Sequence, residues 1–161
     1  MQRTNFFTII LLTFPNFTII KSKTKHTKYE WNQYYHMNRK EQIKNCYNEA
    51  VNYPDLAKKL NSIGVESYTV ATATGSLLYR FAEGETVLHQ ENSITRIIAA
   101  QFDEQLTVQA IRDNQQGKSD YPGFMNAIAA AGVYFYEATL NGNNRRVTYI
   151  GKGGYYEEAI P

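Results

Sequence analysis

Several side chains in the second half of the chain have types and spacings that could support chemistry. His89 and Glu91 stand two residues apart in a predicted short strand, so they share one face and could form an acid-base pair. Arg145 and Arg146 are neighbours in another predicted strand and point to opposite faces. One of them could therefore face a cleft beside Tyr134 and bind a carboxylate or a phosphate.

Each of these features also has a simpler structural interpretation, namely a solvated side chain on a surface strand. Cys46 also has a structural interpretation. It lies three residues after Ile43 in a predicted helix, which is typical of a small core residue. Glu157 and Glu158 alternate faces of a strand, so they cannot form a catalytic pair. The glycine-rich stretch at 151–154 does not open a helix and is predicted to be a turn.

Metal and cofactor sites are not predicted. The chain has a single cysteine, which excludes an internal disulfide and a cysteine-based zinc cluster. Its three histidines, His26, His36 and His89, lack metal-ligand spacing. No phosphate-binding loop of the GxxxxGK[ST] type is present either.

The first 36 residues differ from the rest in composition, because they contain no Ala, Gly, Val or Asp. A stretch of AT-rich upstream sequence read as protein would have this pattern. We therefore expect translation to start at Met37, with 1–36 a non-native or disordered extension of a cytoplasmic domain at 37–161. The alternative is a signal or anchor, although the apolar run from Phe6 to Ile20 is shorter than the roughly 20 residues of a membrane-spanning helix.

The net charge of +2 depends on this first segment. Residues 1–36 hold five basic side chains against the single acid Glu30, which leaves 12 basic and 14 acidic residues after them, a net of −2. A mildly acidic domain lacks the positive patch of a nucleic-acid binder. Nucleic acid and membrane are therefore not the expected partners.

The chain repeats itself, because the stretch at 120–140 echoes the stretch at 52–72 position by position. Each copy predicts a capped helix that starts at Asn52 or Asp120, a proline in its first turn, and a glycine stop. Tyrosines that recur in both copies indicate packing rather than an active site. The repeat markers are Tyr53 and Tyr121, Pro54 and Pro122, Gly64 and Gly132, Tyr68 and Tyr136, and also Tyr149, which matches Tyr79 two residues out of step.

Each half of 37–161 is predicted to contain two helices, a β-hairpin and a short third strand, with the halves at 37–91 and 92–161. The first helices of the halves are expected at about 39–51 and about 104–116. A lone half would leave a sheet face and a helix face bare, so the two halves should share one core. We expect one α+β domain in which helices pack on an antiparallel sheet with pseudo-twofold symmetry.

The stretch that begins at Asp120 and ends with Glu158 to Pro161 resembles the C-terminal signature of the YdfO-like family of small bacterial proteins. The matching elements are Asp120-Tyr121-Pro122, Phe124, Ala131-Gly132-Val133, Tyr136, Tyr149, Gly151 and the closing Glu-x-x-Pro. The similarity extends from about Met37 to the end. The resemblance implies a domain of unknown function without known catalytic residues, often labelled "phage envelope protein", and hence a link to mobile elements at most.

Two classes of function follow from these observations. The favoured hypothesis is a non-enzymatic binding or interaction module for a protein or a small ligand, which could form a homodimer. The alternative is a small acid-base enzyme that uses His89 with Arg145 or Arg146 and a tyrosine. A pocket that joins these side chains would favour the enzyme, and their separation would favour the binding module.

Overall fold

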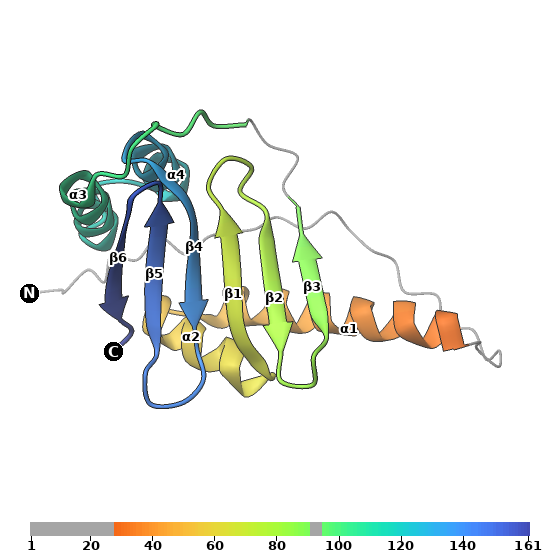
Figure 1. Cartoon of the computed structure of the whole chain (residues 1–161). Coiled ribbons are helices and arrows are strands. Elements are labelled where there is room, and N and C mark those ends of the chain that lie inside the picture. The colour runs from red at the N-terminus through yellow and green to blue at the C-terminus, as the bar shows by residue number, and fades with distance from the viewer. Residues whose placement is uncertain (1–27, 91–94) are drawn as a thin grey trace, which may run out of the picture.

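The computed structural model describes residues 28–90 and 95–161, with side chains described from residue 38 onward. Two helices and three strands are followed by the same series again (Figure 1). The first series is α1 (Lys28–Glu49), α2 (Tyr53–Ser62), β1 (Val65–Ala71), β2 (Leu77–Phe81) and β3 (Thr86–His89). The second is α3 (Glu104–Gln115), α4 (Tyr121–Ala130), β4 (Val133–Thr139), β5 (Arg146–Gly151) and β6 (Gly154–Ala159).

The strands form one antiparallel sheet in the order β3-β2-β1-β4-β5-β6, so the first strands of the two series meet at its centre. The expectation of an α+β fold with an antiparallel sheet is confirmed. Each hairpin is closed by a turn with a left-handed glycine, Gly75 between β1 and β2 and Gly142 between β4 and β5. These are the turns that the TGS and NGNN sequences predict.

The buried strand residues all lie on one face of the sheet, where they form a single core cluster with buried residues from all four helices. Tyr68 pairs across the sheet with Tyr79 and Ala138, and Tyr136 pairs with Tyr149. The molecule therefore has two layers, with α1 and α2 toward one end of the strands and α3 and α4 toward the other (Figure 1). Outer-face residues such as Thr69 and Glu137 are only partly buried.

The helices begin and end where the local sequence requires. The side chains of Asn52, Asp103 and Asp120 accept hydrogen bonds from backbone N–H groups in the first turns of α2, α3 and α4. Gly64 and Gly132 follow the ends of α2 and α4 with φ of +93° and +80°, a conformation that other residues adopt at a cost. The predicted caps and stops are therefore confirmed.

The register of the central strands follows the alignment of the two copies. Val70 pairs with Tyr136, and Tyr68 pairs with Ala138. In the alignment of the two copies, Val70 corresponds to Ala138 and Tyr68 to Tyr136, so these two pairs are equivalent. Thr69 and Glu137 are counterparts of each other and are paired directly, so the local pseudo-twofold relation passes through this pair. That the two halves arose by duplication stays a prediction.

The first helix is longer than predicted. The sequence pattern placed it at about 39–51, whereas α1 starts at Lys28. No proline or glycine interrupts residues 28–49, so nothing in the local sequence stops the helix earlier. Within the described parts of the chain, no helix combines the length and the apolar character needed to cross a membrane.

Candidate ligand-binding cavity

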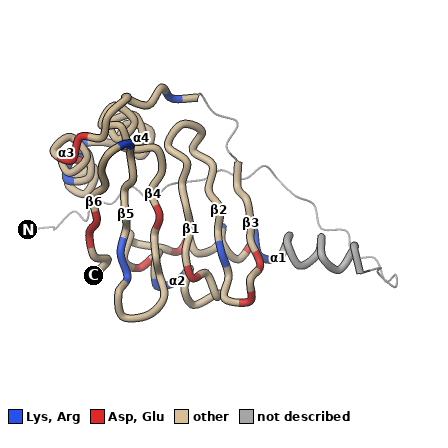
Figure 2. The backbone as a smooth tube through the Cα atoms, in the orientation of Figure 1, with Lys and Arg blue, Asp and Glu red and all other residues tan. Residues whose placement is uncertain are grey.

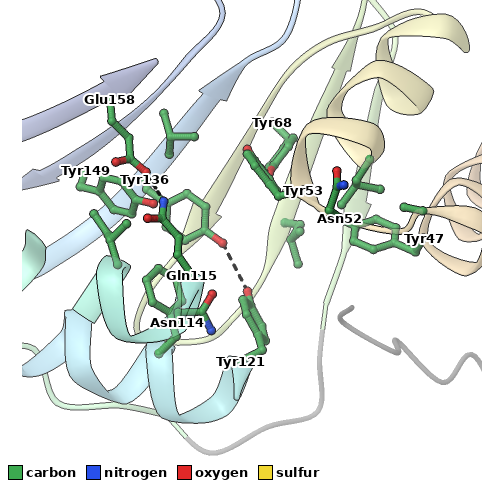
Figure 3. Close-up of a pocket in the computed structure, with 16 residues that line it drawn as sticks. Tyr47, Asn52, Tyr53, Tyr68, Asn114, Gln115, Tyr121, Tyr136, Tyr149 and Glu158 are labelled. Atoms are coloured by element: carbon green, nitrogen blue, oxygen red, sulfur yellow. Dashed lines mark hydrogen bonds between the residues drawn. The ribbon is translucent and has the colours of Figure 1, made fainter. Parts of the chain in front are cut away.

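A cavity of about 130 Å³ lies over the centre of the sheet, between the two helix pairs, and is partly open to solvent. All four helices and the strands β1, β2, β4 and β5 contribute to its walls, as does Glu158 of β6. Figure 3 shows the side chains that converge on it from α1 and α2 on one side and from α3 and α4 on the other. The aromatic lining consists of Phe124 and six tyrosines, namely Tyr47, Tyr53, Tyr68, Tyr121, Tyr136 and Tyr149.

Two pairs of tyrosine hydroxyls at the cavity each join a helix to a strand. Tyr53, at the start of α2, and Tyr68 of β1 have hydroxyl oxygens 2.9 Å apart. The matching pair in the second half, Tyr121 and Tyr136, is 3.5 Å apart (Figure 3). Because each pair joins the first turn of a helix to a strand, the hydroxyls fix how closely the helix approaches the sheet.

Burial keeps these hydroxyls neutral. Loss of solvent raises the pKa of Tyr47, Tyr68, Tyr136 and Tyr149 well above the ordinary tyrosine range, and it is also the main cause of a raised pKa at Tyr53. At neutral pH the hydroxyls can therefore donate and accept hydrogen bonds without carrying charge. The cavity surface is mostly apolar, and Glu158 is the charged residue among the described residues that line it.

One end of the cavity is polar. The Glu158 carboxylate accepts a hydrogen bond from Gln115 Nε2 at 3.0 Å (Figure 3). It also forms an ion pair with Arg112 Nη1 at 2.9 Å. Arg112 also donates through Nη2 to the hydroxyl of Tyr156 at 3.2 Å. Asn114 also lines the cavity. The carboxylate that Glu158 brings to the cavity lining is thus already paired with a cation.

His89 lies at the far edge of the sheet from the predicted arginines. It lines a small depression with Lys40, Ile43, Tyr79 and Val87. Its predicted partner Glu91 falls outside the described residues. Strand β3 is separated from β5 by four strand spacings, or about 19 Å, so the sheet does not bring His89 to Arg145 or Arg146.

The remaining predicted candidates are also separated from one another. Arg145 donates to the carbonyl of Pro161 at 3.1 Å, and Arg146 forms an ion pair with Glu157 at 3.0 Å on the outer face. Tyr134 is exposed near the opposite end of the β4–β5 ladder, about five residues or 17 Å from Arg146. Tyr134, Arg145 and Arg146 are all absent from the cavity lining.

The structure bears out two of the structural interpretations of single residues. Cys46 is buried in the core, and burial raises the pKa of its thiol, which disfavours a reactive thiolate. Glu157 and Glu158 do point to opposite faces. Glu157 accepts from Arg146 and Thr148 outside, whereas Glu158 lies at the cavity.

Glu158, Gln115 and Tyr47 line the cavity but were not predicted to share a site. Their only sequence signal was position, because all three fall on the inward faces of predicted elements. Along the described backbone, acidic and basic residues are interspersed over the strands and helices (Figure 2). Charge therefore gives no indication of the cavity.

The fold and the cavity define a two-layer α+β domain with a site between its two helix pairs. Residues 40–155 match the family model described as a protein of unknown function, DUF1398, and the chain belongs to this family. No curated protein matches the chain.

Proposed function

We propose that the protein binds a small, largely apolar molecule in the tyrosine-lined cavity, and that binding rather than catalysis is its activity. The observation that carries this proposal is the cavity itself. Ligand sites are typically concave, mostly apolar and few per protein, and this cavity lies over the sheet centre with mostly apolar walls and an opening to solvent.

The size of the cavity limits the ligand. A dry cavity of roughly 150 Å³ accommodates benzene. At about 130 Å³, the site has room for one ring, and its partial opening to solvent leaves room for a substituent. The aromatic walls favour a planar ligand, because rings attract one another in offset or edge-to-face contacts.

The acid-base enzyme is the weaker alternative. It requires His89, an arginine and a tyrosine to meet, and these lie on separate strands or at opposite ends of a ladder. The cavity has a carboxylate, Glu158, but both of its oxygens already accept hydrogen bonds. A general base needs access to a proton on its substrate.

The resemblance to the YdfO-like family leads us to propose a role linked to phage or other mobile elements. We further propose that the folded unit is the domain at 37–161 and that it acts in the cytoplasm. Its mild acidity argues against nucleic acid as a partner. A homodimer is compatible with a cavity that one chain lines by itself.

A cavity-filling substitution tests the proposed function. Ala50 is 3% exposed and lines the cavity, so Ala50→Leu adds three carbons to the space for the ligand. Val51 is 65% exposed and does not line the cavity, so Val51→Leu is the matched control. Melting temperatures are measured for both variants and the wild type with a panel of uncharged single-ring compounds.

We expect at least one compound to raise the melting temperature of the wild type and of Val51→Leu. A ligand at 100 times its Kd stabilises a protein by about 2.7 kcal/mol, which is several degrees for a small domain. Ala50→Leu should lose this response while remaining folded. The proposal fails if no compound stabilises the wild type, or if Ala50→Leu responds as the wild type does.

A further inference from the structure

Tyr79 and Tyr149 occupy equivalent places in the sheet, but only the hydroxyl of Tyr79 has a hydrogen-bond partner on a described helix. Tyr79 of β2 has its hydroxyl 2.9 Å from that of Tyr47 of α1. Tyr149 of β5 has the same place beside β4 that Tyr79 has beside β1. The buried face of α3 repeats that of α1, with Thr107, Ala110 and Ile111 spaced like Ile43, Cys46 and Tyr47. At the position of Tyr47, α3 therefore offers Ile111, which has no hydroxyl.

The hydroxyl of Tyr149 is consequently left without a partner among the described residues. Tyr149 is 6% exposed and lines the cavity, and no described residue forms a hydrogen bond with its hydroxyl. Because the cavity is partly open, this hydroxyl is accessible to a molecule that enters it. Here the group borders the cavity, so a bound molecule can supply the acceptor that α3 does not.

The surroundings of Tyr149 determine the charge of that acceptor. An anionic ligand would lie close to the carboxylate of Glu158, which also lines the cavity. A cationic ligand would have to compete with Arg112 for the same carboxylate. An uncharged acceptor, such as a carbonyl oxygen or a ring nitrogen, meets neither obstacle.

We infer that the ligand is an uncharged single-ring molecule with a hydrogen-bond acceptor, and that this acceptor binds the hydroxyl of Tyr149. The inference rests on the proposed function. The ring of the ligand would lie among Phe124, Tyr136 and Tyr149, where the Tyr136 and Tyr149 centroids are 5.4 Å apart and Phe124 meets Tyr149 edge to face at 6.4 Å. The second half of the cavity thus recognises the polar group, while the hydroxyls of the first half stay paired with each other.

Four single-ring probes test this assignment, namely benzamide, toluene, benzoate and benzylammonium. Their affinities are measured by NMR titration of the full chain as wild type, Tyr149→Phe and Tyr79→Phe. Tyr149→Phe removes the hydroxyl that borders the cavity without a described partner, and Tyr79→Phe removes the equivalent hydroxyl that is bonded to Tyr47. Circular dichroism checks that each variant is folded, and Tyr155→Phe on the exposed outer face replaces Tyr79→Phe if that variant is unstable.

We expect benzamide to bind most tightly to the wild type. Tyr149→Phe should weaken benzamide roughly tenfold, the value of one hydrogen bond, and leave toluene unchanged. The control variant should bind benzamide as the wild type does.

Equal binding of benzamide to wild type and Tyr149→Phe would overturn the role of Tyr149 while leaving the proposed function intact. Tightest binding of benzoate or benzylammonium would overturn the uncharged ligand. If none of the four probes binds, the inference and the proposed function both fail.

Discussion

The sheet has two equivalent outer corners, one at the β2–β3 turn and one at the β5–β6 turn, and different contacts hold them. Beside β2 and β3, Arg39 of α1 donates to the carbonyl of Ile63 at 2.9 Å and forms ion pairs with Glu83 at 2.7 Å and Glu85 at 3.1 Å. Its guanidinium carbon also lies 4.4 Å from the centre of the Phe81 ring. One cation thus joins α1, the end of α2 and the β2–β3 turn.

The contacts at the other corner, the β5–β6 turn, are apolar. Phe102, in the segment before α3, packs its ring on two glycines, and a β-carbon at Gly151 or Gly154 would come within 2.9 Å or 2.6 Å of that ring. The backbone N–H of Phe102 donates to the carbonyl of Lys152 at 3.2 Å. The ring therefore occupies space that exists only because the strands carry no side chain there.

The two corners show that equivalent positions of the two halves can be packed by different side chains. Phe81 pairs with Val65, and Gly151 pairs with Val133 at the same point of the other hairpin. In the first half the aromatic ring comes from the strand and is covered by Arg39. In the second half the strand supplies a glycine, and the ring of Phe102 comes from outside. A repeat in the sequence therefore does not imply a repeat in the contacts.

Alkaline pH is expected to remove the difference between the halves by unfolding both. Burial raises the pKa of Tyr47, Tyr53, Tyr68, Tyr79, Tyr136 and Tyr149 above the ordinary value of about 10. Above pH 10 the unfolded chain loses these protons and the folded chain retains them. Stability is therefore unaffected by these groups below about pH 10 and falls as pH rises above it.

Six such groups can together exceed a typical domain stability of about 5–15 kcal/mol within about two pH units. Circular dichroism and tyrosinate absorbance, followed from about pH 9 to 12, should change in one transition. Ionisation of all tyrosines near pH 10 with the fold intact would contradict the expectation.

The glycines that end α2 and α4 should respond very differently to one added methyl group. A β-carbon at Gly132 would overlap the carbonyl oxygen of Gln101, whereas at Gly64 its nearest neighbour is Phe81 Cδ1 at 3.7 Å. Gly64→Ala should cost about 1 kcal/mol, the penalty of a left-handed backbone. Gly132→Ala should cost about 3 kcal/mol or more, because a backbone must also move. Urea denaturation measures both, and equal costs would show that the segment at 95–103 yields freely.

The smallest expected effect is a difference between the two corners in how their contribution to stability depends on salt. Arg39→Met keeps an apolar stem but removes the ion pairs, and should destabilise by about 1–2 kcal/mol, chiefly through the 15% exposed Glu85 rather than the 71% exposed Glu83. Phe102→Leu should cost about 1 kcal/mol. Denaturation midpoints with and without about 1 M NaCl should show a smaller deficit for Arg39→Met in salt and an unchanged one for Phe102→Leu. Identical salt responses would mean that the Arg39 corner is held by packing alone.

The features of the fold that could be predicted depend on a few residues that are adjacent in the sequence. The caps at Asn52 and Asp120 and the stops at Gly64 and Gly132 depend on a few adjacent residues, and the structure has them where the sequence predicted. Alternation along strands likewise predicted opposite faces for Glu157 and Glu158. These features need no knowledge of the rest of the chain.

The cavity could not be predicted, because it depends on contacts between distant parts of the chain. Arg112 and Glu158 are 46 residues apart, and Tyr47 and Tyr79 are 32 apart. Which tyrosine finds a partner depends on how α1 and α3 sit on the sheet. The recurrence of the tyrosines in both copies predicted packing, and their place at the edge of a cavity depends on the register and on the helix positions.

The pairing of β1 with β4 also has a consequence for the order of folding. Within each hairpin the paired strands are joined by a short turn, so their residues are close in sequence. Across the centre of the sheet, the chain that links Ala71 to its partner Phe135 contains β2, β3, α3 and α4. Closing such a long loop costs more entropy than closing a hairpin, so the central pairing should be the slow step. The cavity, whose walls come from both sides of that pairing, would then be among the last features of the molecule to form.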